Sequence, residues 1–400
     1  MSDAYIYDGL RTPFGRHAGA LAPVRADDLL AGVIKALVAR NPFKAETYED
    51  SVMGCTNQAG EDARNVARHA ALLAGLPTSI GGITVNRLCG SGLAAICDAA
   101  RAINAGQGDL FVAGGVESMS RAPFVMAKSE SAYAREARVF DSTIGARFPN
   151  PKIAKIFGQD TMPETADNVG RDLGIAREAS DRFALASQEK YATAKAEGFF
   201  TGEIAGVSVP GAKRGTETAV TEDEHPRPNT TLDRLQELKP LFPNGVVTAG
   251  NASGINDGAG ALIVGSLKCG EKAGKKPLVR LVSAAIAGVE PRVMGLGPVP
   301  ACKKALARAG LTLKDMNVIE INEAFATQVL GCLKLLELSK DEARVNPNGG
   351  AIAVGHPLGA SGARLALTAI RELHRRGGRY ALVSMCIGVG QGIAAIVERV

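Results

Sequence analysis

The sequence predicts an α/β protein whose core consists of two similar halves. Short β-branched runs alternate with segments of helical periodicity, which is typical of α/β architecture with largely parallel strands. The segment around Ser91-Gly92 also resembles the segment around Ser361-Gly362, at a constant offset of 270 residues. With 400 residues, the chain is long enough for two or three domains and a substantial core.

The two matching segments define the elements that we expect in each half. Both contain Ser-Gly, an apolar helix, a glycine (Gly108 or Gly378) and an apolar strand. A chance match among small residues is the alternative, but a duplicated half is the interpretation that we favour. The expected elements are a strand at Ile83–Val85, a helix at 90–103 and a strand at 109–113, then a strand at 318–321, a helix at 359–374 and a strand at 380–384.

Residues 121–248, between the halves, differ from them in composition. This stretch has many charges, several prolines and a polar run at 222–229, while a helical pattern at 180–198 indicates an ordered segment. We predict an inserted loop domain that lies over both halves and binds substrate; a purely structural cap is the alternative. The predicted domains are residues 1–120 with 249–274, residues 121–248, and residues 275–400.

Composition excludes several functional classes. The net charge of +5 is mild and no block of Lys and Arg is interleaved with aromatic residues, so we expect no nucleic-acid partner. The seven cysteines are scattered without a CxxC pair, which argues against a disulfide framework and a zinc site. The N-terminus lacks the pattern of a signal peptide, and no apolar run is long enough to span a bilayer. We therefore predict a cytoplasmic protein without membrane contact.

One cysteine stands where a strand is expected to end and a helix to begin, in Asn86-Arg87-Leu88-Cys89-Gly90-Ser91-Gly92. The positive end of the helix dipole should lower the pKa of the Cys89 thiol, and free backbone N–H groups at this point can hold an oxyanion. We interpret Cys89 as a nucleophile. A buried structural cysteine is the alternative, and it is our interpretation of Cys97 on the following helix.

Three further polar groups are expected at strand ends or in the loops beside them. His356 lies between Gly355 and Pro357, Asn322 follows the strand at 318–321, and Cys386 precedes glycine-rich turns. A loop histidine with satisfied hydrogen bonds is the alternative for His356. Sites of α/β proteins form at such strand ends, and a nucleophile, a base, a second acid and an amide together indicate acyl transfer through a thioester.

Six motifs together resemble the thiolase family, in that family's order and over nearly the whole chain. They occupy residues 86–92, 114–120, 248–258, 322–326, 355–362 and 386–392. The resemblance implies two βαβαβαββ halves in five layers, α-β-α-β-α, with an inserted loop domain. It also implies a homotetramer built as a dimer of dimers.

The resemblance assigns a role to each catalytic residue. Cys89 accepts the acyl group, His356 removes the thiol proton, and Cys386 is the acid and base at the substrate carbon. Asn322, through a water molecule, and His356 hold the thioester oxygen, whereas the N–H groups of Cys89 and Gly388 form a second oxyanion hole. No metal or cofactor takes part, because coenzyme A is a substrate. The positions that match the family's coenzyme A contacts are Met162, Arg227, Ala249, Ser253, Ile255, Ala324 and Phe325.

The finer resemblance is to the 3-oxoadipyl-CoA thiolases of aromatic-acid catabolism, which include enzymes of the β-ketoadipate and phenylacetate pathways. It rests on residues 55–68, 129–133, 141–148, 288–295 and 385–391. Ala146 departs from that group, which has Trp there, and Thr161 stands where biosynthetic acetoacetyl-type thiolases have His. The implied reaction is cleavage of 3-oxoadipyl-CoA by coenzyme A to succinyl-CoA and acetyl-CoA.

Alternatives to this substrate and function remain. A broader 3-ketoacyl-CoA or acetoacetyl-CoA thiolase is one, whereas a thiolase-like lipid carrier would be expected to lack a catalytic group, and a ketosynthase has one Cys and two His. We further predict that Arg147 pairs with the terminal carboxylate of the substrate, since an unpaired buried carboxylate is costly and a guanidinium can bind it through two hydrogen bonds. The alternative is a solvated Arg147 or one paired with a neighbouring Asp.

Overall fold

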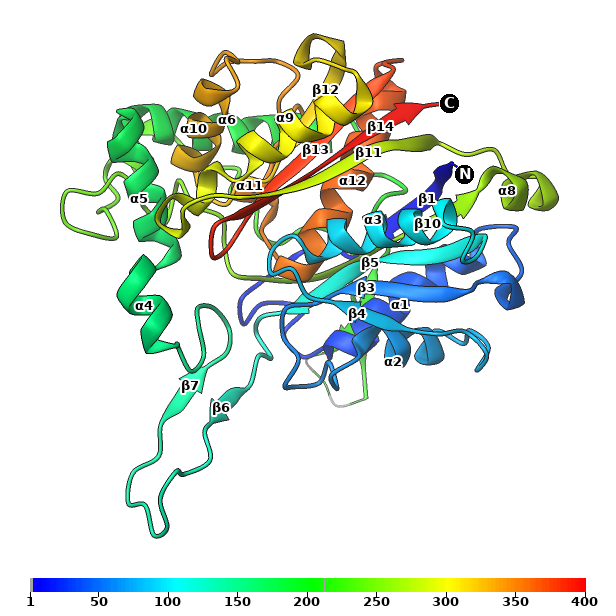
Figure 1. Cartoon of the computed structure of the whole chain (residues 1–400), viewed down its shortest axis with the longest axis horizontal. Helices are drawn as coiled ribbons and strands as arrows, with labels where there is room; N and C mark the ends of the chain where they lie inside the picture. Colours follow the sequence, from blue (N-terminus) through cyan, green and yellow to red (C-terminus); the bar gives the residue numbers. More distant parts are fainter. Residues whose placement is uncertain (1–2, 212, 214) are drawn as a thin grey trace.

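The computed structural model describes residues 3–211, 213 and 215–400. Met1 and Ser2 of the first predicted half, and residues 212 and 214 of the predicted insertion, lie outside the described residues. One ten-stranded mixed sheet runs through the molecule in the order β12-β13-β14-β11-β1-β10-β5-β3-β4, with β2 beside β10 (Figure 1). The strands of the first half are β1 (Ala4–Arg11), β2 (Gly15–Arg16), β3 (Asp50–Gly54), β4 (Ile83–Val85), β5 (Leu110–Ser118) and β10 (Asn256–Ser266). Those of the second are β11 (Val279–Gly288), β12 (Met316–Ile321), β13 (Tyr380–Ile387) and β14 (Gln391–Arg399).

The strand order repeats in the two halves when it is read outward from the junction between β1 and β11. The order β1-β10-β5-β3 corresponds to β11-β14-β13-β12, and in both series two antiparallel pairings are followed by a parallel one. In the first half, β4 then pairs in parallel with β3. The second half has only a single parallel bridge there, between Ile319 and Val345. This matching order supports the duplication inferred from the 270-residue offset.

The expectation of largely parallel strands was wrong. Among the named strands of the sheet that the structure describes, the parallel pairs are β3–β4, β3–β5 and β12–β13. The remaining pairings of this sheet are antiparallel, among them β1 with β11 at Tyr5–Arg280 and Ile6–Val279. In each half, the strand that follows the last crossover helix is paired with a strand that runs in the opposite direction. In the second half, these are β13 and β14, which are joined by a tight turn, and such a turn connects only antiparallel strands.

The helices form three layers around the two halves of the sheet (Figure 1). The central layer holds α3 (Ser91–Asn104) and α12 (Leu358–Arg375), the first outer layer α1 (Ala26–Ala39) and α2 (Val66–Leu73), and the second α9 (Pro298–Ala309) and α10 (Ala326–Leu335). Side chains of α3 and α12 are buried nearly all round, in one apolar cluster with strands of both halves. The outer helices α1, α2 and α9 bury one face each against their own half, whereas α10 is buried from Ala326 to Leu333. These contacts produce the five layers, α-β-α-β-α, that the resemblance implied.

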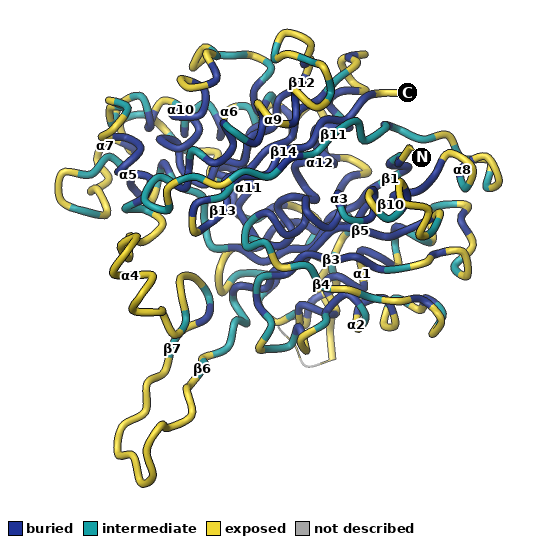
Figure 2. Tube along the Cα trace, viewed as in Figure 1, coloured by how far each residue is buried: buried dark blue, intermediate teal, exposed yellow. Residues whose placement is uncertain are grey.

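Most of the remaining elements lie between the halves in the sequence. They are β6 (Phe124–Met126), β7 (Val139–Asp141), α4 (Pro151–Phe157), α5 (Met162–Leu173), α6 (Arg177–Ala196), β8 (Val207–Pro210), β9 (Glu217–Val220) and α7 (Leu232–Gln236). Elsewhere are α8 (Leu267–Ala273), α11 (Ala351–Val354) and the 3₁₀ turns Ala45–Thr47, Pro291–Leu296 and Leu313–Asp315. Through Tyr191, α6 packs against Phe14 of the first half and Ala353 of the second. The β6–β7 hairpin, in contrast, extends from the body as an exposed arm (Figure 2).

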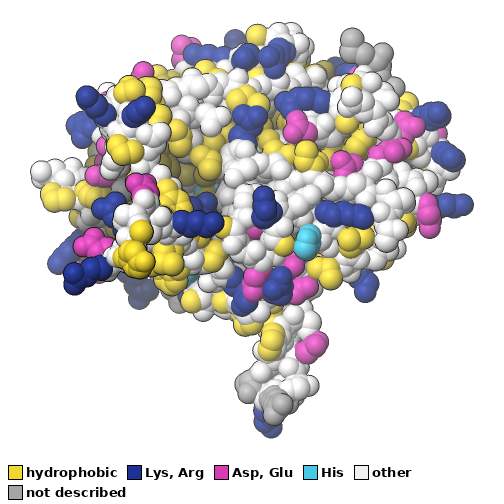
Figure 3. Space-filling view, turned by 60° about the horizontal axis from the view of Figure 1, so that its bottom comes forward, with side chains coloured by type: hydrophobic (Ala, Val, Ile, Leu, Met, Phe, Trp, Pro, Cys, Tyr) yellow, Lys and Arg dark blue, Asp and Glu magenta, His cyan; other side chains and the backbone are white. Residues whose placement is uncertain are grey.

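The surface shows no single dominant charge. On the face in Figure 3, Lys and Arg side chains lie among acidic and apolar ones. Within the described part of the chain, no helix has the length and apolar character needed to cross a bilayer. All seven cysteines are free, and Cys97 is buried in the central apolar cluster.

Candidate active site

Cys89 lies in the turn between β4 and α3. The preceding Leu88 has a φ of 46°, a left-handed conformation that non-glycine residues rarely adopt. Ser91 fixes this turn, because its hydroxyl donates to the carbonyl of Leu88 at 2.6 Å and accepts from the N–H of Arg87 at 2.9 Å. A strained backbone held by hydrogen bonds therefore presents the Cys89 side chain.

The pKa of the Cys89 thiol is raised to about 11, so the predicted lowering was wrong. Enclosure of the thiol by protein is the main cause, since a thiolate loses its hydration there. The backbone N–H groups of Gly388 and of Cys89 itself act in the opposite direction, while the charge of Glu117 adds to the rise. Burial outweighs the dipole of α3, and the thiol needs a base to ionise at neutral pH.

Cys386 is the second thiol of the site. It is the penultimate residue of β13, lies opposite Gly392 of β14, and is buried. Burial raises the pKa of Cys386, and the charge of Cys89 raises it further. The chain segments that carry the two thiols, one from each half, are in contact, because a Cβ atom on Gly90 would lie 2.6 Å from Cδ1 of Ile387, and these residues directly follow Cys89 and Cys386. Gly388 lies in the β13–β14 turn, and its N–H reaches the Cys89 sulfur. The N–H groups of Cys89 and Gly388 thus converge where the sequence predicts an oxyanion hole.

His356 lies in the loop between α11 and α12, buried, with both ring nitrogens engaged. Its Nδ1 is 2.6 Å from Oγ of Ser361, and this hydroxyl is placed to donate to the carbonyl of Pro357 at 2.8 Å. A hydroxyl has one proton to donate, so Nδ1–H of His356 donates to Ser361 and Nε2 is left as an acceptor. These partners assign the tautomer in which Nε2 can act as a base.

The amide of Asn322 faces this base from the end of β12. Its Nδ2 is 3.3 Å from Nε2 of His356, whereas its Oδ1 is buried without a hydrogen-bond partner among the described protein atoms. An ordered water molecule is the usual partner of such an atom. The pKa of His356 is lowered to about 3, mainly by burial and also by the charge of Arg364. The imidazole is therefore neutral at pH 7, as a general base must be.

The starts of α3 and α12 touch, which brings the Cys89 turn and the His356 loop together. A Cβ atom on Gly92 would lie 2.5 Å from the carbonyl oxygen of Gly359, and one on Gly362 would lie 2.2 Å from the nitrogen of Leu93. Glu117 crosses the same boundary, since its carboxylate accepts from the N–H of Gly359 at 2.9 Å. Only glycine permits these close backbone approaches.

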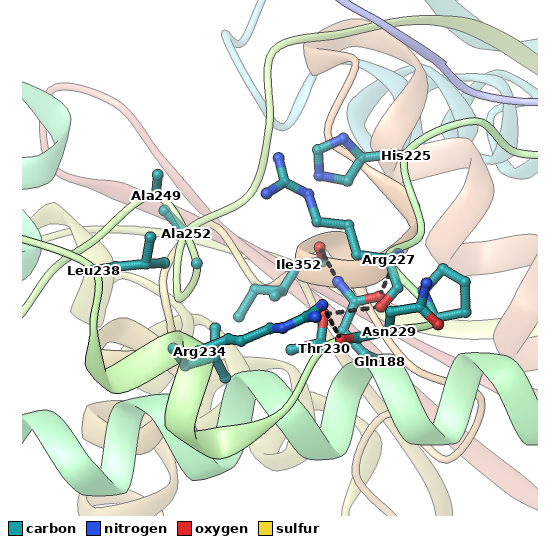
Figure 4. A pocket seen from close by; sticks show the side chains of 13 residues that line it. Gln188, His225, Arg227, Asn229, Thr230, Arg234, Leu238, Ala249, Ala252 and Ile352 are labelled. Atoms are coloured by element: carbon teal, nitrogen blue, oxygen red, sulfur yellow. Dashed lines mark hydrogen bonds between the residues drawn. The ribbon is translucent and has the colours of Figure 1, made fainter.

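A cavity of about 310 Å³ lies under the inserted domain (Figure 4). Two of the predicted coenzyme A positions, Arg227 and Ala249, line it. Gln188 fixes the loop there, because its amide accepts from the N–H of Arg227 at 2.9 Å and donates to the carbonyl of Ile352 at 3.1 Å. His225 lines the cavity as well, and its Nδ1 has no hydrogen-bond partner among the described protein atoms.

The other predicted coenzyme A positions lead from this cavity to the thiols. Ala252, on the cavity wall, forms a β-bridge with Phe325, and the N–H of Ser253 donates to the carbonyl of Ala324 at 2.9 Å. Ala324 and Phe325 pack in one apolar cluster with Cys386.

The last two predicted coenzyme A positions, Met162 and Ile255, lie in different places. Met162 begins α5, and its sulfur would lie 3.9 Å from a Cβ atom on Gly388. The carbonyl of Ile255 accepts from the N–H of His17. Of these two, only Met162 is thus placed beside the predicted oxyanion hole.

Arg147 occupies a different environment from the thiols. Its Nη2 donates to the carbonyl of Ser142 at 2.9 Å, and its Nε is buried without a partner among the described atoms. Burial raises the pKa of Asp62, and the charge of Arg147 is one of the causes that oppose this rise. The nearby carboxylate of Asp62 fits the alternative that Arg147 is paired with a neighbouring Asp. The Nε of Arg147, however, remains as one donor for a ligand. Its role in binding substrate stays a prediction.

Sequence reasoning missed three residues that hold the base and its loop. Ser361 fixes the tautomer of His356, the Oδ1 of Asn256 accepts from the N–H of His356 at 2.9 Å, and Glu117 binds the loop through Gly359. Asn256 and Glu117 lie inside the quoted motifs, and Ser361 is the repeat partner of Ser91, so their positions were the available signal. Among the described residues, no group of three or more His, Cys, Asp and Glu side chains could hold a metal ion.

Comparisons with known proteins show the family of the chain. The family model "Thiolase, N-terminal domain" matches residues 4–268, and "Thiolase, C-terminal domain" matches residues 275–399. The chain is 61% identical over 402 residues to the 3-oxoadipyl-CoA/3-oxo-5,6-dehydrosuberyl-CoA thiolase of Escherichia coli (strain K12), covering 100% of both chains. It is 56% identical, again over 100% of both chains, to a beta-ketoadipyl-CoA thiolase of Acinetobacter baylyi.

Solved structures give the same result. The crystal structure of human mitochondrial 3-ketoacyl-CoA thiolase in complex with CoA is 39% identical, with a TM-score of 0.92 and coverage of 100% of this chain and 98% of that chain. The acetyl-CoA acetyltransferase of Bacillus anthracis is 36% identical, with a TM-score of 0.92 and coverage of 100% and 99%.

Proposed function

The chain belongs to the thiolase family of acyltransferases, and from this premise we propose that it cleaves 3-oxoadipyl-CoA with coenzyme A to succinyl-CoA and acetyl-CoA. One observation carries the chemistry: two thiols from different halves, Cys89 and Cys386, lie close together in a site that also holds a neutral histidine. One thiol can hold an acyl group while the other moves a proton.

The first half reaction breaks the carbon–carbon bond. Nε2 of His356 takes the proton of Cys89, and the thiolate attacks the 3-oxo carbon. The N–H groups of Cys89 and Gly388 are placed to stabilise the oxyanion that forms there. As the bond between C2 and C3 breaks, the electron pair moves to the enolate of acetyl-CoA, and the thiol of Cys386 protonates C2. The succinyl group stays on Cys89.

The second half reaction releases the acyl group. Free coenzyme A gives its thiol proton to the Cys386 thiolate and attacks the succinyl thioester. The N–H groups of Cys89 and Gly388 stabilise the oxyanion of this step again, because the acyl oxygen is the former 3-oxo oxygen. The amide of Asn322 with a water molecule, and the imidazolium of His356, hold the thioester oxygen of the acetyl-CoA enolate in the first half reaction. Cys89 leaves as a thiolate and recovers its proton from His356, so both thiols and the imidazole return to their starting states.

The substrate assignment rests on relatives with this specificity. Two proteins named as 3-oxoadipyl-CoA or beta-ketoadipyl-CoA thiolases match the full chain at 61% and 56% identity. A role in aromatic-acid catabolism, including the β-ketoadipate and phenylacetate pathways, follows from this substrate. We assign the terminal carboxylate of the substrate to Arg147 and the coenzyme A moiety to the cavity around Arg227.

We also propose a homotetramer and a location in the cytoplasm. The exposed arm carries large apolar side chains, Phe124 at 76% and Met126 at 62% exposure, which a second pair of chains could cover. The seven free cysteines suit a reducing compartment. Light scattering of the purified protein should give the mass of four chains, and Phe124→Ser with Met126→Ser should give dimers.

Covalent trapping tests the proposed reaction. Incubation with 3-oxoadipyl-CoA in the absence of free coenzyme A should release acetyl-CoA and add one succinyl group to the peptide that contains Cys89. A succinyl group on Cys386 alone would reverse the assigned roles of the two thiols. Absence of any acylated peptide, with the substrate intact, would refute the reaction.

Rates across substrates test the specificity separately. Thiolysis of 3-oxoadipyl-CoA should exceed that of acetoacetyl-CoA and of 3-oxohexadecanoyl-CoA in kcat/KM. A preference for the long apolar chain would instead favour the broader 3-ketoacyl-CoA thiolase. Equal values of kcat/KM for 3-oxoadipyl-CoA and acetoacetyl-CoA would mean that the enzyme does not recognise the terminal carboxylate of 3-oxoadipyl-CoA.

A further inference from the structure

A buried ion pair lies directly behind the histidine and the asparagine of the site. Arg364 of α12 and Glu320 of β12 are 2% and 0% exposed, and Nη1 of Arg364 is 3.3 Å from Oε2 of Glu320. None of the catalytic steps above uses this pair. A buried ion pair is not by itself a source of stability, because desolvation of both charges offsets their attraction.

The position of the pair follows from the periodicity of the two elements. Alternate residues of a strand share a face, and Val318 of β12 lies in the central apolar cluster while Ile319 and Ile321 lie in the outer one. Glu320 therefore points toward α12. Asn322 continues this alternation, since its N–H donates to the carbonyl of Ser384 as the next step of the ladder.

The helix shows the matching arrangement. Ser361, which binds Nδ1 of His356, and Arg364 are three residues apart on α12 and thus lie on one face of the helix. The end of β12 and the start of α12 with its preceding loop consequently contact each other through two successive pairs of side chains. The first pair is Asn322 and His356, and the second pair, further from the end of the strand, is Glu320 and Arg364.

The pair is incompletely satisfied within the protein. Nε and Nη2 of Arg364 and Oε1 of Glu320 are buried and find no hydrogen-bond partner among the described protein atoms. Thr368, one turn further along α12, has an unpartnered buried hydroxyl as well. Folded proteins enclose ordered water where several such atoms gather, and keep such arrangements chiefly at functional sites.

We propose that Arg364 and Glu320 are positioning residues, because their ion pair holds α12 and β12 in the register at which the imidazole of His356 meets the amide at the end of β12. The inference rests on the proposed function, since it assigns a role within the thiolase site. Burial lowers the pKa of His356, and the charge of Arg364 lowers it further. The other charged groups whose fields reach the pair are Arg11, Glu203, Glu323 and Glu372.

Substitution of Arg364 with a matched control tests the inference. Arg364→Met removes the charge but keeps an unbranched side chain of similar length, and Arg364→Lys keeps the charge. The control is Arg371→Met, on the same helix but two turns further from His356, where Arg371 is paired with Glu203 at 3.4 Å. Thiolysis of acetoacetyl-CoA is measured from about pH 2.5 to 8, so that the range includes the acidic limb expected near pH 3, with circular dichroism at each pH to show that each variant is folded.

We expect Arg364→Met to lower kcat by roughly 10- to 100-fold, because small displacements of catalytic groups have effects of this size. The KM for coenzyme A should stay nearly constant, Arg364→Lys should retain more activity, and Arg371→Met should match the wild type. The acidic limb of the pH profile of kcat/KM should move to higher pH in Arg364→Met, since loss of a cation favours the imidazolium. A purely structural role would not move this limb.

If Arg364→Met fails to fold, Glu320→Gln serves as the second variant. It removes the charge of the partner with little change in shape, and the same loss in kcat is expected. A folded variant of either residue with wild-type kcat, or an acidic limb that stays in place, would overturn the inference. Thiolysis by the unchanged protein is the internal reference: if the wild type itself is inactive, the proposed function fails, whereas active variants overturn only the positioning role.

Discussion

The start of α3 and the start of α12 are equivalent positions in the two halves, but the first follows the turn that carries Cys89 and the second follows the loop that carries His356. Ser91 and Ser361, 270 residues apart, each donate a hydrogen bond to a backbone carbonyl in the turn before the helix, at 2.6 and 2.8 Å. Ser91 then accepts from the backbone of Arg87, whereas Ser361 accepts from Nδ1 of His356. The same serine fixes a strained nucleophile turn in one half and a base in the other.

This difference shows how a duplicated fold acquires one asymmetric site. The repeat partner of Cys89 is Gly359, where the absence of a side chain allows the backbone to approach the carbonyl oxygens of Val116 and Gly54. In the proposed mechanism, one half therefore supplies the acyl acceptor and the other supplies the base, the amide and the second thiol. Neither half contains a complete site.

Removal of the nucleophile should have the largest effect. Cys89→Ala should lower thiolysis by at least roughly 10⁴-fold, because the acyl group then has no acceptor. Cys89→Ser should leave at most a trace, since a hydroxyl is a far weaker nucleophile than a thiolate. Steady-state assays with 3-oxoadipyl-CoA measure both. Substantial activity in Cys89→Ala would mean that the second half alone can carry the reaction.

The second thiol should separate acylation from proton transfer. Cys386→Ala should still accept an acyl group on Cys89 from an acyl-CoA, but exchange of the methyl protons of acetyl-CoA with solvent should fall by about 10²- to 10⁴-fold. Proton NMR in D₂O follows this exchange, and mass spectrometry follows the acylation. Unchanged exchange would identify another acid and base, with His356 the first candidate.

The two equivalent serines give the most direct test of the comparison. Ser361→Ala should lower kcat by roughly 10- to 100-fold at nearly unchanged stability, because the imidazole loses the partner that fixes its tautomer. Ser91→Ala should instead lower the free energy of unfolding by about 1–3 kcal/mol, since the N–H of Arg87 loses its partner, whereas the carbonyl of Leu88 still accepts from the N–H of residue 91. Chemical denaturation and kcat are measured for both. Identical behaviour of the two variants would refute the different roles.

Arg147→Ala should have the smallest effect, and only on one substrate. We expect kcat/KM for 3-oxoadipyl-CoA to fall by about 10-fold or more, with acetoacetyl-CoA unaffected, because only the first ends in a carboxylate. Arg121→Ala is the matched control, since Arg121 is already paired with Glu61 through both guanidinium branches. Equal losses on both substrates would make Arg147 structural and would place specificity elsewhere in the inserted domain.

Local patterns in the sequence determined the elements and their order. The strand at Ile83–Val85, the helices that begin near residues 90 and 359, and the 270-residue repeat follow from hydrophobic periodicity and from glycines at turns. Cys89 was identified at a strand-to-helix junction because such junctions are defined by neighbouring residues. The family motifs then named the remaining catalytic side chains.

Only the tertiary structure decided how these parts act on one another. The direction of each strand pairing depends on where the chain returns, and the pKa of Cys89 depends on how much protein encloses the thiol, so both expectations based on local pattern were wrong. The tautomer of His356 depends on Ser361, and its protonation on burial and on Arg364. The physical reason is common to all: solvation and electrostatic interactions act between residues that are distant in sequence and adjacent only after folding.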